Sequence, residues 1–269
     1  MAKKKAKKPH VRLTPTKYTE VSKLDYSVYI MTKQEKILYT LLAAIVLFAI
    51  GYVFYKNIII SCIFALLSFK YPDIRAKEIA EKRQRELGLQ FKDMLYSLSS
   101  AVSSGSSVET GISIALDEMR KQYVSPDTMI IQELNLMVSR LSMGITIEQV
   151  MKDFANRSHN EDVRTFSNIF EVAKRQGGNM IQIIRQTTDV ISQKIETKAD
   201  IETELSGRKM EQKVLTAMPI LLVVLMTYTT GGFMDVIFTS WEGRLVSTIA
   251  LLMIIGGSLW SKKIADIHI

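Results

Sequence analysis

The stretch ILYTLLAAIVLFAIGYVFY, residues 37–55, holds 19 residues and no charged side chain. A helix rises about 1.5 Å per residue, so a helix of this length nearly crosses the roughly 30 Å hydrocarbon core of a bilayer. A second uncharged stretch, residues 58–69, follows directly after Lys56 and Asn57 and has only 12 residues. Both stretches are therefore candidates for membrane-spanning helices, although the second is short for that role.

The charges on either side of these stretches indicate a hairpin. Residues 1–36 contain ten lysines and arginines, and residues 70–85 contain six. Basic flanks are typical of the cytoplasmic side, and two cytoplasmic flanks require an even number of crossings. We therefore predict a transmembrane hairpin over residues 37–71, with spans at 37–55 and 58–71. One long, kinked helix is the alternative.

Two further uncharged stretches follow much later, VLTAMPILLVVLMTYTT from Val214 and LVSTIALLMIIGGSLW from Leu245. The first contains a proline, which membrane helices tolerate. We predict a second transmembrane hairpin over residues 214–262, with spans at 214–232 and 245–262. Together the two hairpins give a multi-pass protein with four crossings and both termini in the cytoplasm.

The basic balance of the chain comes from its N-terminal arm. Residues 1–36 hold ten basic and three acidic side chains, so they carry nearly all of the net charge of +8. We predict that residues 1–36 are a basic cytosolic N-terminal arm, and that its stretch Lys3–Lys8 is flexible and lies near anionic lipid headgroups or sets the topology. A nucleic-acid face would place basic residues on the folded domain, so nucleic acid is not an expected partner.

The region between the hairpins reads as helices joined by tight turns. Its helix starts carry an oxygen-bearing residue three positions before Glu or Gln, the pattern of a capping box. These pairs are Ser106 with Glu109, Thr146 with Gln149, Asn179 with Gln182 and Ser158 with Glu161, and Ser125 precedes a proline suited to a first helical position. The helices expected from these signals run near residues 73–103, 107–122, 126–142, 146–156, 159–176 and 180–213.

The expected fold is therefore all-α. It is an integral membrane protein with a cytosolic helical bundle, residues 72–213, between two transmembrane helical hairpins. The last helix of the bundle differs from the others, because residues 194–213 hold ten charged side chains in twenty positions. A helix this polar cannot be buried on all sides. It leads directly into the apolar stretch at Val214, so it either transmits motion into the bilayer or is a solvated stalk without a partner.

Two stretches of the bundle resemble a known family. FKDMLYSLSSAVSSG, residues 91–105, is similar to the opening of a type II secretion system F domain. VAKRQGGNM, residues 172–180, and the charged helix that leads to Pro219 resemble the second half of that domain. The resemblance covers roughly residues 37–265. Larger members carry two such domains, whereas this chain has one between two hydrophobic pairs, which is similar to the TadB and TadC proteins of tight-adherence pilus systems.

The resemblance implies a platform protein of the inner, cytoplasmic membrane. Such a platform belongs to a type IV pilus-like (tight adherence) or type II secretion machine, where it couples a cytosolic hexameric secretion ATPase to the assembly of pilin-like subunits. The implied partners are that ATPase, the pilin-like subunits, a paralogous or identical platform subunit, and the lipid bilayer. The chain departs from these relatives in its long Lys-rich arm and its short second span.

The residues alone leave two other classes open. A transporter or channel subunit is disfavoured, because the predicted spans carry no interior ionisable side chain of the kind that marks ion pathways. A membrane-anchored signalling scaffold requires that the bundle bind a regulator instead of an ATPase. No Gly-x-x-x-x-Gly-Lys-[Ser/Thr] phosphate loop occurs in the sequence. We expect no enzymatic activity, no cofactor and no metal.

The contacts with the ATPase are expected on exposed turns and on the charged helix, because a transient motor interface is polar and reversible. Acidic side chains four residues apart on a helix repel one another, which costs a few tenths of a kcal/mol per pair without a partner. The residues predicted to contact a partner are Arg175, Gly177, Gly178, Glu196, Asp200, Glu202 and Glu204.

Overall fold

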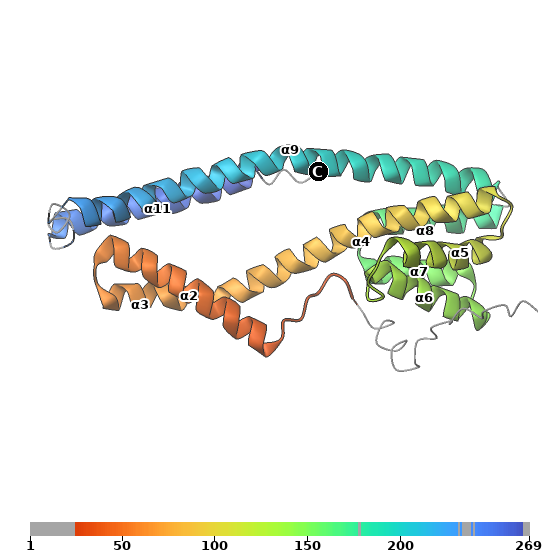
Figure 1. Cartoon of the computed structure of the whole chain (residues 1–269), viewed down its shortest axis with the longest axis horizontal. Helices are drawn as coiled ribbons and strands as arrows, with labels where there is room; N and C mark the ends of the chain where they lie inside the picture. The colour runs from red at the N-terminus through yellow and green to blue at the C-terminus, as the bar shows by residue number, and fades with distance from the viewer. Residues whose placement is uncertain (1–24, 177–178, 231, 233–237, 239, 266–269) are drawn as a thin grey trace, which may run out of the picture. The chain divides into compact units, whose positions relative to one another are not determined.

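The computed structural model describes residues 25–176, 179–230, 232, 238 and 240–265. All regular structure within these ranges is helical, which confirms the expectation of an all-α chain (Figure 1). The chain divides into two compact units. The first, here called the bundle unit, comprises Ile79–Ile195 together with Met1–Val28, of which residues 25–28 are described. The second, here called the membrane unit, comprises Tyr29–Glu78 and Glu196–Ile269.

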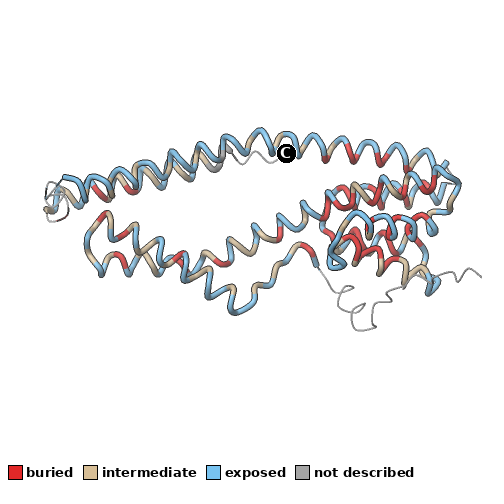
Figure 2. The backbone as a smooth tube through the Cα atoms, viewed as in Figure 1, coloured by how far each residue is buried: buried red, intermediate tan, exposed pale blue. Residues whose placement is uncertain are grey.

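The bundle unit contains four complete helices and parts of two longer ones. The complete helices are α5 (Val108–Gln122), α6 (Met129–Ser142), α7 (Ile147–Ser158) and α8 (Glu161–Gln176). The longer helices are α4 (Tyr71–Ser103), whose later part lies in this unit, and α9 (Met180–Thr229), whose first part does. Buried residues concentrate in this unit, whereas the helices of the membrane unit are mostly exposed (Figure 2).

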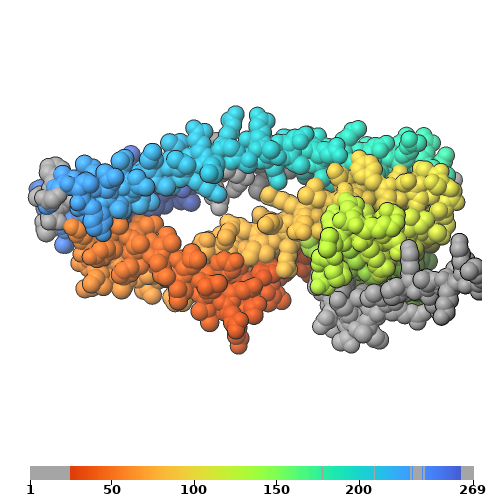
Figure 3. Space-filling model, in the orientation of Figure 1, coloured from red at the N-terminus to blue at the C-terminus, as the bar shows by residue number. Residues whose placement is uncertain are grey.

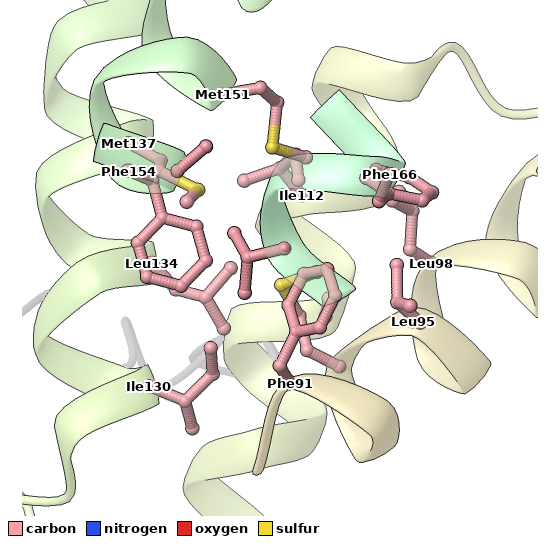
Figure 4. Packing of buried hydrophobic residues seen from close by; sticks show 14 of the residues in the cluster. Phe91, Leu95, Leu98, Ile112, Ile130, Leu134, Met137, Met151, Phe154 and Phe166 are labelled. Atoms are coloured by element: carbon pink, nitrogen blue, oxygen red, sulfur yellow. The ribbon is translucent and has the colours of Figure 1, made fainter. Parts of the chain in front are cut away.

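Three phenylalanines from different helices form the centre of the core (Figure 4). Phe91 in α4, Phe154 in α7 and Phe166 in α8 are each at most 2% exposed. The Phe91 ring centroid lies 6.0 Å from that of Phe154 and 5.8 Å from that of Phe166, the latter in an edge-on arrangement. Aromatic pairs at such separations contribute beyond their burial, so they fix these three helices against one another.

Two of the predicted helix caps are present. The Thr146 side chain accepts a hydrogen bond from the Gln149 amide at 3.5 Å, and the Asn179 side chain accepts one from the Gln182 amide at 3.2 Å. Each bond satisfies one of the amides that a helix start leaves without an intrahelical partner. These local signals explain why α7 and α9 begin where the sequence indicated.

Three other predicted starts are corrected by the structure. Helix α5 is capped by Ser107, which accepts from the Thr110 amide at 3.2 Å, and not by Ser106. Helix α8 is preceded by Asn160, whose side chain accepts from the Asp162 amide at 2.8 Å, whereas Ser158 is the last residue of α7.

The start of α6 also differs. The helix begins at Met129, three residues later than predicted, with Thr128 as its N-cap. The Ser125 side chain accepts from the Asp127 amide at 3.3 Å, and the Ser125 carbonyl accepts from the Thr128 hydroxyl at 2.7 Å. Ser-Pro therefore forms a turn here rather than a helix start, because both motifs use the same oxygen acceptors.

The membrane unit is built from α2 (Lys33–Tyr55), α3 (Ile58–Leu66), the 3₁₀ turn η1 (Leu67–Lys70), the later part of α9 and α11 (Trp241–Ala265). Among the described residues, three helices are long and apolar enough to cross a membrane: Lys33–Tyr55, Met180–Thr229 and Trp241–Ser261. Their large apolar side chains are widely exposed; Leu41, Leu42, Ile45, Leu221, Leu222, Leu225, Leu252 and Met253 are all more than half exposed. Such surfaces are suited to hydrocarbon and not to water.

The first predicted hairpin is only partly represented among these spans. The backbone of Lys56 is left-handed (φ 41°), the Asn57 side chain accepts from the Ile59 amide at 2.9 Å, and α3 packs against α2. A Cβ on Gly51 would lie 3.0 Å from the Ser61 Cα, so the two helices approach closely. The chain is thus broken at Lys56 rather than forming one kinked helix.

The second span of that hairpin, predicted at 58–71, is not one of the three. Helix α3 has nine residues and rises about 13 Å, less than half of a hydrocarbon core. It is followed by η1 and by the charged helix α4. The four-crossing topology therefore stays a prediction.

Helix α9 runs without interruption for 50 residues and includes Pro219. Its first part contributes Ile184, Ile191 and Ile195 to the core of the bundle unit. The compact bundle unit ends at Ile195, and between Glu196 and Lys213 none of the described side chains is buried. The boundary of the cytosolic bundle at residue 213 stays a prediction.

Candidate functional site

One end of the bundle is organised around Lys174 in the last turn of α8. Its Nζ lies 3.0 Å from Oε1 of Glu148 and 3.9 Å from Oε1 of Glu109. These acids stand in the first turns of α7 and α5. The ion pairs therefore place the end of α8 beside the starts of α5 and α7, with charges that complement the helix dipoles. We call this the turn end of the bundle.

The turns at this end are tight. Gly105 before α5 and Gly144 before α7 have φ values of 91° and 84°, which favour glycine. Met143, beside Gly144, is 70% exposed. The turn end thus presents narrow, accessible loops.

Electrostatics at the turn end keep Glu148 ionised. Burial raises the pKa of this carboxyl, but hydrogen bonds from its own backbone amide and from Lys174 outweigh that effect, so the pKa lies below its usual value. Arg175, the neighbour of Lys174, is exposed and donates to Oε1 of Glu171 at 2.7 Å. Of the predicted contact residues near this end, Gly177 and Gly178 lie outside the described residues.

The other predicted contacts lie on the charged segment of α9, residues 194–213. Lys194 fixes the start of this segment, because its Nζ lies 2.7 Å from Asp162 Oδ1 and 3.4 Å from Glu161 Oε2. Beyond it, Figure 3 shows α9 running along the visible surface of the molecule. The segment is thus anchored at one end and accessible along its length.

Helix geometry divides the four predicted acids into two groups. Glu196, Asp200 and Glu204 are exposed and recur every fourth residue, so they lie on one side of α9. We call these three residues the acidic row. Glu202 is also exposed, but two residues from Asp200 along a helix is about 200°, so it faces the opposite side. The four-residue patch inferred from sequence is therefore a row of three with Glu202 apart.

The opposite end of the bundle is where α4 and α9 leave it. There the Gln90 side chain of α4 accepts from the Ile130 amide of α6 at 3.1 Å, and the Asn160 side chain donates to the Gln84 carbonyl of α4 at 3.4 Å. Lys194 of α9 meets the start of α8 at the same end, as described above. We call this the exit end of the bundle.

A buried ionic network lies at the exit end. Glu133 in α6 has a fully buried side chain, and its carboxylate accepts two hydrogen bonds from the Arg157 guanidinium of α7, at 2.5 and 2.7 Å. Arg157 Nε also donates to Asp153 Oδ2 at 3.0 Å, and Arg140 pairs with the same oxygen at 2.5 Å. Burial lowers the pKa of Arg157, but Glu133 and Asp153 outweigh it, so the guanidinium stays charged.

Tyr26 completes this network from the N-terminal arm. Its hydroxyl donates to Glu133 Oε1 at 2.8 Å, its amide donates to the Arg157 carbonyl at 3.1 Å, and only 3% of the residue is exposed. Burial and the neighbouring Glu133 carboxylate raise the pKa of Tyr26 far above its usual value. The N-terminal arm is thus docked in the bundle core at this residue, whereas the flexible stretch predicted at Lys3–Lys8 lies outside the described residues.

Sequence reasoning missed this network. A lone acid at Glu133, between Ile130 and Leu134 on the apolar side of α6, was the available signal. Tyr26 is 107 positions from its partner Glu133, so no local pattern connects them. Among the described residues, no group of three or more His, Cys, Asp and Glu could hold a metal ion.

The comparisons with known proteins identify a protein family. The family model described as "Type II secretion system (T2SS), protein F" matches residues 94–228, half of the chain. The matched range begins within α4 and ends within the apolar part of α9. No curated protein and no solved structure matches the chain.

Proposed function

The chain belongs to the type II secretion system protein F family, and from this premise we propose that it is a membrane platform coupling a cytosolic hexameric secretion ATPase to the assembly of pilin-like subunits. Family membership itself implies a platform role in secretion or pilus assembly. The platform proteins of this family are not enzymes, which confirms the expectation drawn from the sequence. They generally partner with secretion ATPases and pilins.

The observation that carries the proposal is the continuity of α9. This single helix packs Ile184 and Ile191 into the bundle core and continues to Thr229 in the apolar segment. We infer that this unbroken helix passes a displacement of the bundle along its axis. Pro219 lies where the helix has already become apolar, a position at which a kink could change the direction of that displacement.

The ATPase is proposed to contact two separate surfaces, the acidic row of α9 and the turn end of the bundle. Asp200 and Glu204 put like charges on one side of an exposed helix, where they repel each other. A basic surface on the motor would relieve that repulsion and allow rapid, reversible contact. Arg175 is the proposed contact at the turn end, and Gly177 and Gly178, which follow it in the sequence, are further proposed contacts.

The pilin-like subunits are proposed to meet the membrane unit. The exposed leucines of α9, including Leu221, Leu222 and Leu225, offer an apolar surface to an equally apolar pilin helix or to lipid. A paralogous or identical platform subunit is a further proposed neighbour in the cytoplasmic membrane. We also propose that the platform is of the tight-adherence type, similar to TadB and TadC, and the F-domain match over residues 94–228 supports this proposal.

The proposal is tested in a cell that lacks this chain and is complemented with variants. Deletion should abolish surface fibres or secretion of the machine's substrate, and the wild type should restore them. Asp200→Lys with Glu204→Lys should not restore them, although its level in the membrane is normal. Glu202→Lys is the matched control and should restore them, because this residue lies on the other side of α9. Normal assembly after deletion contradicts the platform role.

A further inference from the structure

The buried tyrosine of the arm stands close in sequence to the first predicted membrane helix. Six residues, 27–32, separate Tyr26 from the start of α2 at Lys33. Tyr26 belongs to the bundle unit, whereas α2 belongs to the membrane unit. We call residues 27–32 the strap. The strap therefore joins a residue fixed in the bundle core to the beginning of a helix that is long and apolar enough to cross the membrane.

Tyr26 is held in the bundle by both apolar packing and hydrogen bonds, and we call the residues that surround it its socket. Its ring belongs to the core cluster, while its hydroxyl and amide are bonded to Glu133 of α6 and to Arg157 of α7. Asp25 adds a further contact, because its Oδ1 lies 3.2 Å from Nε2 of His159, the C-cap residue of α7. Two adjacent helices of the bundle thus grip this residue through both its side chain and its backbone.

The turn next to Tyr26 is also ordered by hydrogen bonds. Oδ1 of Asp25 accepts from the Ser27 amide at 2.8 Å and from the Ser27 hydroxyl at 2.6 Å. These bonds lower the pKa of Asp25, and the neighbouring His159 lowers it further. The carboxylate form therefore closes the turn, which fixes the direction in which the strap leaves its socket.

The socket matters because of which helices form it. Helices α4 and α9 continue from the bundle unit into the membrane unit. Helices α6 and α7 do not; the chain joins them only to α5, to each other and to α8. Tyr26 consequently attaches the α6–α7 pair to α2, a connection that the order of the helices does not otherwise make.

We propose that Tyr26 is a coupling residue, through which movement of α6 and α7 is transmitted by the strap to α2. This inference rests on the proposed function, since it assigns a second route for the motion that α9 carries. A connection of six residues can extend only a little before it transmits displacement, whereas a longer flexible linker absorbs it. The length of the strap is therefore as important as the anchor.

The experiment separates coupling from simple stabilisation of the bundle. A flexible Gly-Ser linker of about eight residues is inserted between Val28 and Tyr29 of the full chain, which leaves the Tyr26 socket intact. The matched control carries the same linker after Val124, a residue that is 100% exposed in the turn between α5 and α6. Tyr26→Phe and Tyr26→Ala complete the set. Fibre assembly or secretion, membrane level and hydrogen exchange of the Tyr26 amide are measured in membranes.

The strap insertion is expected to reduce assembly by about tenfold or more, while the Tyr26 amide stays protected and the Val124 insertion assembles normally. Tyr26→Phe should show a smaller loss and Tyr26→Ala a loss of protection as well. Normal assembly by the strap insertion overturns the proposal, because Tyr26 would then only stabilise the bundle. The deletion and complementation described above test the platform role separately, so the two failures are distinct.

Discussion

Glu133 in α6 and Arg157 in α7 form a two-bond ion pair in which the carboxylate is fully buried. Two charges removed from water are tolerated only when their hydrogen bonds are satisfied. Here Tyr26 and Asp153 supply the additional bonds. The pair therefore fixes α6 against α7 at the exit end and creates the polar socket that receives Tyr26.

Breaking this pair from one side should be costly. Arg157→Met leaves the Glu133 carboxylate buried without its cation, and we expect a loss of about 3–5 kcal/mol in the free energy of unfolding. Glu133→Gln in the same chain removes the uncompensated charge and should recover most of that loss. Denaturant unfolding of the full chain in detergent, followed by circular dichroism, measures both. If the Arg157→Met chain is as stable as the wild type, the Glu133–Arg157 ion pair is not buried as described.

The hydroxyl of Tyr26 makes stability depend on pH in the alkaline range. Tyrosine ionises near pH 10 in an unfolded chain, whereas burial and Glu133 raise the pKa of Tyr26 above that value in the folded protein. Its contribution is complete below about pH 10 and is lost as the pH rises toward the folded pKa. Tyr26→Phe should therefore be about 1.5–3 kcal/mol less stable at neutral pH, and the difference should shrink above about pH 10.

The alkaline comparison has an internal control. Tyr123 also has a raised pKa, through burial and its hydrogen bond to Asp93, and it is present in both chains. Its effect cancels in the difference between wild type and Tyr26→Phe. Stability curves that stay parallel from about pH 9 to 11 would show that the Tyr26 hydroxyl is not buried against Glu133.

Two glycines should respond in opposite ways to an added methyl group. A Cβ on Gly111 in α5 would lie 2.8 Å from Cδ1 of the buried Leu98 in α4, so Gly111→Ala should destabilise the bundle by about 1–3 kcal/mol. Gly207 in α9 has no atom within 4 Å of that position. Gly207→Ala should stabilise the helix by up to about 1 kcal/mol. Melting temperatures that shift in the same direction would be unexpected.

The topology is tested by reporter fusions. The basic flanks predict that fusions at Lys56 and Phe238 report the outside of the membrane, and that fusions at Arg120 and Ile269 report the inside. The short α3 makes the signal at Arg120 the informative one, because nine helical residues do not span a bilayer and an α3 that fails to cross would leave Arg120 outside. A signal from the outside at Arg120 would show that α2 and α3 do not form a transmembrane hairpin.

Short sequence patterns at helix ends predicted most of the helices. Thr146 and Asn179 mark helix starts correctly, because a side chain that caps a helix acts within three residues of itself. Ser125 was wrongly predicted to cap a helix, because its oxygens can also accept the hydrogen bonds of a turn, as they do here. The continuity of α9 through Pro219 was also readable, as no stop signal interrupts it.

The separation of Glu202 from the acidic row could have been predicted, because it follows from helix spacing alone.

Other features could not be predicted, because they depend on contacts between segments that are distant in the sequence. The socket of Tyr26 could not, because it needs α6 and α7 to be in register before Glu133 and Arg157 meet. Close helix packing at Gly51 and Ser61 likewise appears only in three dimensions.

The central claim is that this chain stands between a motor and the subunits it moves. Its most direct test is crosslinking in intact cells, followed by purification of the tagged full chain from membranes and identification of the proteins bound to it. We predict that the secretion ATPase and a pilin-like subunit are both enriched, and that Asp200→Lys with Glu204→Lys loses the ATPase and keeps the pilin-like subunit. Enrichment of neither protein over an untagged control would contradict the account.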